Sequence, residues 1–193
     1  MKSVSVFCGS NVGNDPVFAQ SARALGRTLA EEGITLVYGG ARVGLMGEIA
    51  DSALQSQGRV IGVIPQFLQD KEIAHSGLSE LIICSSMHER KLKMFELSQG
   101  FIALPGGFGT LDEVFEINTW QHLGLHKFPV GFLNVGGFYD PLLRQIEQMV
   151  RSGFLKPELQ QTAIMGDNIP DLLSRMKSYK APDVKKWIRA EST

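Results

Sequence analysis

Seven short apolar runs, rich in β-branched residues, recur along the chain, and most of the intervals between them have helical spacing. They cover residues 4–7, 34–38, 60–64, 81–84, 101–104, 130–135 and 162–165. Runs of this length are typical of buried strands, and strands that alternate with helices predict a parallel sheet covered on both faces. The sequence therefore predicts an α/β chain, with a doubly wound parallel sheet of about seven strands flanked by helices.

The first helix carries the clearest start and stop signals. Asp15 can cap it, Pro16 suits its first position, and Gly33 can end it. An apolar stripe follows one face, made by Phe18, Ala22, Leu25 and Leu29. Further helices are expected after Gly44, from about residue 87 to 98, and after Gly109, Tyr139 and Ile169. We expect a single domain over residues 1–193, with a short docking helix near 183–190.

Composition and charge exclude several classes of protein. Lys and Arg number 19 and Asp and Glu number 20, so the net charge is −1 and bulk charge does not favour binding to nucleic acid. No apolar run approaches the roughly 20 residues of a membrane-spanning helix, and the first seven residues are too short and alternating for a signal peptide. We therefore expect a cytoplasmic protein that binds neither nucleic acid nor membrane.

The cysteines and histidines do not form a recognisable metal site. Cys8 and Cys84 lie in apolar stretches and are expected to be buried thiols. The four histidines lack the spacing of metal ligands: His75, His88, His122 and His126. The sequence therefore predicts neither a metal ion nor a cofactor.

Three glycine- or serine-containing turns directly follow predicted strands, at residues 8–10, 39–44 and 105–110. In a doubly wound sheet these turns meet at the carboxyl edge, where ligands bind. Glycine lets amide N–H groups approach an anion, and the following helix adds the positive end of its dipole. The turns therefore indicate phosphate binding, although neither a P-loop nor the dinucleotide glycine pattern is present. Tight packing between strand and helix is the alternative explanation.

Charged residues accompany the last of these turns. Thr110 is expected to cap the next helix, which places Glu113 at the third helical position. A capping box, in which Glu113 merely accepts from the N-cap amide, is the alternative to a functional role for this carboxylate. Arg90 and Lys91 open the preceding helix and can bring a guanidinium and an ammonium group to the same edge of the sheet. A solvated helix face is the alternative for this basic pair.

The stretch Pro105-Gly106-Gly107-Phe108-Gly109-Thr110-Leu111-Asp112-Glu113 resembles the Pro-Gly-Gly-x-Gly-Thr-x-x-Glu motif of the LONELY GUY (LOG) family, formerly mislabelled as lysine decarboxylases. The segments at residues 8–10, 38–40, 44–47 and 87–91 follow in the family's order, so the resemblance covers about residues 4–153. It implies a Rossmann-like fold, usually dimeric, that hydrolyses N6-modified adenosine monophosphates, and often AMP, to the free base and ribose 5-phosphate. Ala41 departs from the pattern, because the family commonly has a third glycine there.

The resemblance also implies roles for individual residues. Arg90 and Glu113 correspond to the catalytic pair. The substrate-binding positions are Glu72, Lys91, Gly106, Gly107, Phe108, Gly109, Thr110, Leu111, Asp112 and Thr119, and the earlier turns add Ser10, Gly39, Gly40 and Met46. Glu72 is expected to form a wall of the base pocket. Thr119, six positions after Glu113, is expected near the same helix face.

Two other functions are alternatives to nucleotide hydrolysis: decarboxylation and nucleotide carriage without catalysis. A decarboxylase would need a lysine that forms a Schiff base with pyridoxal phosphate, and a phosphate contact explains Lys91 and Lys93 without one. A non-catalytic nucleotide carrier could use the same phosphate loops, but it would have little use for Glu113 beside the sugar. A homodimer with the active site close to the interface is expected, because the resemblance implies association and apolar surface near the site helix is offered by Trp120, Leu123, Leu125 and Phe128. The alternative is that these four residues fill the core.

Overall fold

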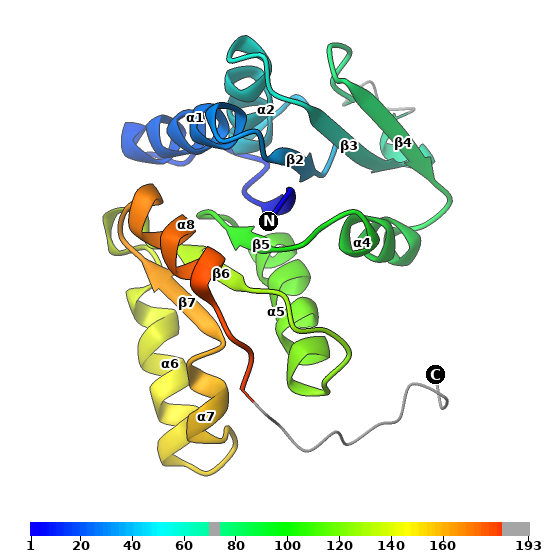
Figure 1. Cartoon of the computed structure of the whole chain (residues 1–193). Coiled ribbons are helices and arrows are strands. Elements are labelled where there is room, and N and C mark those ends of the chain that lie inside the picture. The colour runs from blue at the N-terminus through cyan, green and yellow to red at the C-terminus, as the bar shows by residue number, and fades with distance from the viewer. Residues whose placement is uncertain (70–73, 183–193) are drawn as a thin grey trace.

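The computed structural model describes residues 1–69 and 74–182, and its centre is one parallel sheet of seven strands (Figure 1). All seven predicted strands are confirmed. They are β1 (Ser3–Phe7), β2 (Thr35–Tyr38), β3 (Val60–Pro65), β4 (Glu80–Cys84), β5 (Phe101–Ala103), β6 (Val130–Leu133) and β7 (Ala163–Gly166). The two central strands, β1 and β5, are buried almost throughout, as the apolar runs predicted.

The strand order explains where a ligand can bind. The sheet runs β4-β3-β2-β1-β5-β6-β7, so the chain first builds outward from β1 in one direction and then returns to build in the other. Every pair of neighbouring strands is parallel, including β1 with β5. The two connections that leave β1 and β5 therefore diverge at the carboxyl edge of the sheet, and a crevice opens between them.

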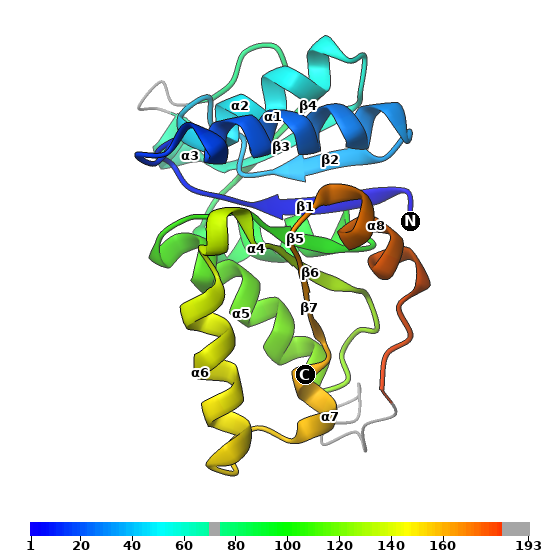
Figure 2. The same cartoon turned by 90° about the vertical axis from the view of Figure 1, so that its left-hand side faces the viewer.

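The helices cover both faces of the sheet (Figure 2). One face carries α1 (Pro16–Glu31), α2 (Gly44–Gln55) and α8 (Ile169–Ser178), and the other carries α4 (Met87–Glu96), α5 (Phe108–His122) and α6 (Asp140–Arg151). The predicted signals of α1 are confirmed: Asp15 accepts a hydrogen bond from the Val17 amide, and Gly33 has a φ of +65°. The Rossmann-like fold is therefore confirmed in both its sheet and its two helical layers.

Three short elements were not predicted, namely α3 (Gln66–Gln69), α7 (Pro157–Gln160) and a 3₁₀ turn at Val135–Gly137. One helical turn is too short to show a periodic apolar pattern. Cys8 and Cys84 are buried free thiols, as predicted. The expected docking helix near 183–190 lies outside the described residues, and the single-domain organisation stays a prediction.

The described residues contain neither a candidate membrane span nor a candidate metal-binding group. Within 1–69 and 74–182, no helix has the length and hydropathy needed to cross a bilayer. The same residues hold no group of three or more potential metal ligands from His, Cys, Asp or Glu.

Candidate active site

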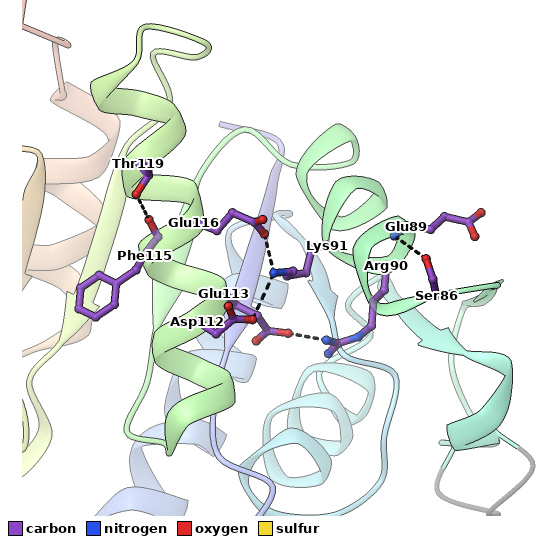
Figure 3. A network of polar contacts seen from close by, with 9 residues as sticks. All are labelled: Ser86, Glu89, Arg90, Lys91, Asp112, Glu113, Phe115, Glu116 and Thr119. Atoms are coloured by element: carbon purple, nitrogen blue, oxygen red, sulfur yellow. Dashed lines mark hydrogen bonds and ion pairs between the residues drawn. The ribbon is translucent and has the colours of Figure 1, made fainter. Parts of the chain in front are cut away.

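A buried ion pair joins α4 to α5 at the carboxyl edge of the sheet (Figure 3). Nη1 of Arg90 lies 2.5 Å from Oε1 of Glu113, and the two residues are only 8% and 9% exposed. Nε of Arg90 also donates to the Val63 carbonyl oxygen at 3.0 Å, so β3 fixes the guanidinium from a second side. The pair predicted from the motif is thus brought together by three separate segments of the fold.

The surroundings of Glu113 oppose its charge. Burial raises the pKa of Glu113, and the Arg90 guanidinium acts against that rise. The Cys8 thiol lies nearby, and its pKa is raised by burial and further by the Glu113 carboxylate. Cys8 therefore stays a neutral thiol. Glu113 is the acidic side chain in this pocket that pairs with the buried Arg90 guanidinium.

The first turn of α4 is anchored by two hydrogen bonds between side chains and backbone amides. Ser86 Oγ accepts from the Glu89 amide at 3.2 Å (Figure 3). Glu89 Oε2 accepts from the Ser85 amide at 2.7 Å. The first bond satisfies a first-turn amide that an isolated helix would leave free, and the second ties the Glu89 side chain to the residue before the N-cap. Because Arg90 follows directly, the direction of its side chain is set by a well-anchored turn.

The start of α5 differs from the prediction. Its N-cap is Gly107, not Thr110, because the chain is extended at Gly107 and already helical from Phe108. Thr110 lies within the first turn, and its side chain packs so closely against Gly106 that a Cβ there would lie 2.1 Å from Thr110 Oγ1. Glu113 is consequently at the sixth helical position, so the capping-box explanation for this residue is wrong. The first-turn amides of α5 are instead left to face a ligand.

A cavity of about 390 Å³ is lined by Arg90 and Glu113 and by residues of all three predicted turns. The turns are joined by backbone bonds from the Gly9 amide to the Pro105 carbonyl and from the Leu45 amide to the Gly9 carbonyl, each 3.0 Å long. Ten of the predicted site residues line the cavity: Ser10, Gly39, Met46, Arg90, Gly107, Phe108, Gly109, Thr110, Asp112 and Glu113. The helix dipole, the free amides and the buried guanidinium all favour an anion here.

Other predicted positions lie outside this lining. Gly40 packs against β3, and Gly106 lines an adjoining hollow of about 240 Å³. Leu111 packs against the core, while Lys91 binds Asp112 at 3.2 Å and Glu116 at 2.9 Å (Figure 3). Lys91 therefore ties α4 to α5. Glu72 lies outside the described residues.

Thr119 does not share the face of Glu113. Its hydroxyl donates to the Phe115 carbonyl at 2.7 Å, and it faces away from the pair (Figure 3). The expected common face was wrong because six residues at 100° each place two side chains about 120° apart around a helix.

Several lining residues were not predicted as site residues, namely Val6, Cys8, Gly9, Leu68 and Met87. Cys8, Gly9 and Met87 belong to the motif segments, so their position in those segments was the available signal. Leu68 lies on α3, whose single turn gave no signal.

Ala41 fits its loop without strain, because Gln57 is the one non-glycine residue with positive φ in the described ranges.

Of the apolar residues expected at the surface near α5, some pack against the core and others are exposed. Trp120 and Phe128 pack against the core beneath α5, with the Trp120 ring edge-on to Phe95. Leu125 is exposed. A different set of apolar side chains is exposed around β4, α4 and α5: Ile83, Met87, Leu92, Phe108 and Phe115.

Comparison with solved structures reflects the fold. The molybdenum cofactor binding protein from Rippkaea orientalis matches with a TM-score of 0.69 and 23% identity, covering 91% of this chain and 95% of that one. The Moco carrier protein from Chlamydomonas reinhardtii matches with a TM-score of 0.68 and 18% identity, covering 91% and 95%. At such identities the likeness concerns the fold alone.

Sequence comparison is more specific. A family described as "possible lysine decarboxylase" matches residues 46–176. The cytokinin riboside 5′-monophosphate phosphoribohydrolase of Rhodococcoides fascians is 47% identical over 92% of this chain and 90% of its own length. A probable enzyme of the same name from Oryza sativa subsp. japonica is 47% identical over 91% and 79%, and one from Arabidopsis thaliana is 42% identical over 93% and 78%. The chain belongs to the LOG family of cytokinin riboside 5′-monophosphate phosphoribohydrolases.

Proposed function

We propose that this protein hydrolyses the N-glycosidic bond of N6-modified adenosine 5′-monophosphates, and of AMP, to release the free base and ribose 5-phosphate. The observation that carries the proposal is the buried Glu113 carboxylate, held by Arg90 beside the amino end of α5. This arrangement places an anion site and a carboxylate in one cavity. The family's activity and the geometry of the cavity support the same reaction.

The residues can divide the chemistry as follows. The free amides of Phe108, Gly109 and Thr110 bind the 5′-phosphate, and the α5 dipole adds to that attraction. Arg90 occupies Oε1 of Glu113, so Oε2 remains for the ribose. When the bond from C1′ to the base breaks, its electron pair leaves with the base and positive charge develops on the sugar. Glu113 stabilises that charge and orients the water, whose OH adds to C1′ while its remaining proton ends on the nitrogen of the departing base.

The 5′-phosphate is expected to be required. Loss of charge-assisted hydrogen bonds from even two of these three backbone amides should lower kcat/KM for adenosine at least about 100-fold relative to AMP. The measurement is release of free adenine from both compounds, with isopentenyladenosine and its monophosphate as a second matched pair. Equal hydrolysis of nucleoside and nucleotide would contradict the proposed phosphate site. No base release from either monophosphate would contradict the proposed activity itself and favour a carrier.

Arg90 is expected to keep its position only if residue 39 has no side chain. A Cβ at this residue would lie 2.3 Å from Nη2 of Arg90, whose guanidinium cannot withdraw without breaking its bonds to Val63 and Glu113. Gly39→Ala should therefore lower turnover by about 10-fold to 100-fold while the fold survives. Gly77→Ala is the matched control, because its Cβ would meet no atom nearer than 3.3 Å. Equal turnover in both variants would show that Arg90 tolerates displacement.

We further propose a cytoplasmic homodimer that covers the exposed apolar side chains of β4, α4 and α5. Met87 supports an interface close to the active site, because it is exposed and also lines the cavity. Leu92 is 49% exposed on the same helix, so Leu92→Glu should shift the protein toward monomer in sedimentation experiments. A wild-type protein that sediments only as a 21.2 kDa monomer at micromolar concentration would refute the dimer.

The near-neutral net charge of the chain supports the absence of nucleic-acid binding.

A further inference from the structure

Residues 74–79 lead into β4 and lie against the second glycine turn, which joins β2 to α2. Ala74 forms an antiparallel bridge with Ala41 of that turn. The His75 amide donates to the Gly40 carbonyl at 2.9 Å. The turn is therefore supported by a backbone segment that comes from neither its own strand nor its own helix.

The supporting segment is itself fixed on β3. Leu78 packs against the core directly over Gly62, where a Cβ would overlap its side chain. Ser79 Oγ accepts from the Val60 amide at 3.0 Å. Because both contacts are made to a central part of the sheet, residues 74–79 provide a firm support for the turn.

The side chain of His75 adds a bond to α2. Nδ1 accepts from the Gly77 amide at 3.0 Å, so the ring hydrogen lies on Nε2 and is donated to Oδ1 of Asp51 at 2.9 Å. The bond from Gly77 involves only its backbone, so the variant Gly77→Ala would retain it. The His75 side chain is 11% exposed, which shields its bond to Asp51 from water.

Asp51 ties His75 to a rigid helix. It lies on α2, which begins directly after the turn and packs so closely on α1 that a Cβ on Gly26 would overlap the Ile49 carbonyl. His75 therefore holds the turn at both ends, through its amide at Gly40 and through its side chain at the following helix.

The same turn forms part of the wall around Arg90. A Cβ on Gly39 would overlap Nη2 of Arg90, so the backbone of the turn lies directly against the guanidinium. The next residue, Gly40, has a φ of +76° and packs against Val63, whose carbonyl accepts from Nε of Arg90. A shift of the turn would consequently loosen the group that holds Glu113.

We propose that His75 is a positioning residue for the hydrolysis reaction, an inference that rests on the proposed function. By clamping the second glycine turn to α2, it keeps Arg90, and through it Glu113, aligned with the ribose. Neither His75 nor Asp51 lines the active-site cavity, so neither contacts the substrate. The phosphate site at the start of α5 is separate from the clamp. Loss of the clamp should therefore lower kcat and leave KM nearly unchanged.

Asp51→Ala tests the clamp without threatening the fold, because the Asp51 side chain is 61% exposed and alanine favours a helix. It should lower kcat for AMP by about threefold to tenfold, the scale of one hydrogen bond, with KM within about twofold of wild type. Glu48→Ala is the matched control, because Glu48 lies on the same helix but pairs with Arg23 of α1. Equal kcat in the two variants, or an effect on KM alone, would overturn the proposal.

Two replacements of His75 separate its side-chain bonds. His75→Gln places an amide nitrogen near the position of Nε2 and can still donate to Asp51, so it should keep at least about half of the wild-type kcat. His75→Asn can accept from the Gly77 amide but is too short to reach Asp51, so it should lose as much as Asp51→Ala. Equal kcat in the glutamine and asparagine variants would overturn the proposal.

Hydrogen exchange measured by NMR reports the position of Arg90 without any turnover. The Arg90 Nε–H group is bonded to the Val63 carbonyl at 3.0 Å, and its exchange should be at least about threefold faster in Asp51→Ala, with no change in Glu48→Ala. Unchanged exchange in Asp51→Ala would overturn the proposal. A wild-type protein that releases no base would refute the proposed function, and the exchange rates would still decide whether His75 holds Arg90.

Discussion

Replacing Glu113 by glutamine is expected to lower the rate of base release by about 10²–10³, the usual cost of one preorganised electrostatic contact. Glutamine keeps the shape of the side chain and can still accept from Nη1 of Arg90, but it cannot offset positive charge on the ribose. The phosphate site on α5 is untouched, so calorimetry should still detect AMP binding. The loss should therefore fall on kcat rather than on binding.

The control for this experiment is Glu116→Gln, on the same helix. Glu116 binds Lys91 near the surface and lies outside the cavity lining, so a general effect of removing a carboxylate from α5 would appear there as well. Rates should be expressed per folded molecule, with thermal unfolding measured on the same preparations. Near-normal release by Glu113→Gln would remove the catalytic assignment and leave a nucleotide-binding protein.

Replacing Arg90 by methionine is expected to lower the free energy of unfolding by about 3–5 kcal/mol at pH 7, because it leaves a buried carboxylate without its cation. The pKa of Glu113 should then rise further, since the guanidinium no longer opposes the effect of burial. The folded form would bind more protons than the unfolded chain between the ordinary pKa of 4.5 and the raised value. The stability deficit should therefore shrink as the pH falls through that interval.

Two comparisons make the stability experiment decisive. Arg23→Met breaks an arginine–glutamate pair of the same 2.5 Å length, but Arg23 is 45% exposed, so the expected loss is only about 0–1 kcal/mol. The double variant Arg90→Met with Glu113→Gln removes both charges and should recover much of the lost stability. Urea unfolding at several pH values measures all four proteins. A pH-independent loss in Arg90→Met would show that lost packing, rather than an unpaired charge, is the cause.

The sequence by itself determined the local elements. Apolar runs predicted all seven strands, and Asp15, Pro16 and Gly33 predicted the limits of α1. These features are local, because a strand or a helix cap depends on residues a few positions apart. The resemblance to the LOG motif then indicated Arg90 and Glu113, whose side chains the structure places in contact.

Tertiary structure decided what each side chain touches. Lys91 directly follows Arg90, yet it binds two surface carboxylates while Arg90 enters the cavity. The N-cap of α5 is Gly107 rather than Thr110, since Thr110 is held against Gly106 within the first turn. Contacts between segments distant in the chain follow from packing geometry, which the local periodicity that identifies strands and helices does not encode.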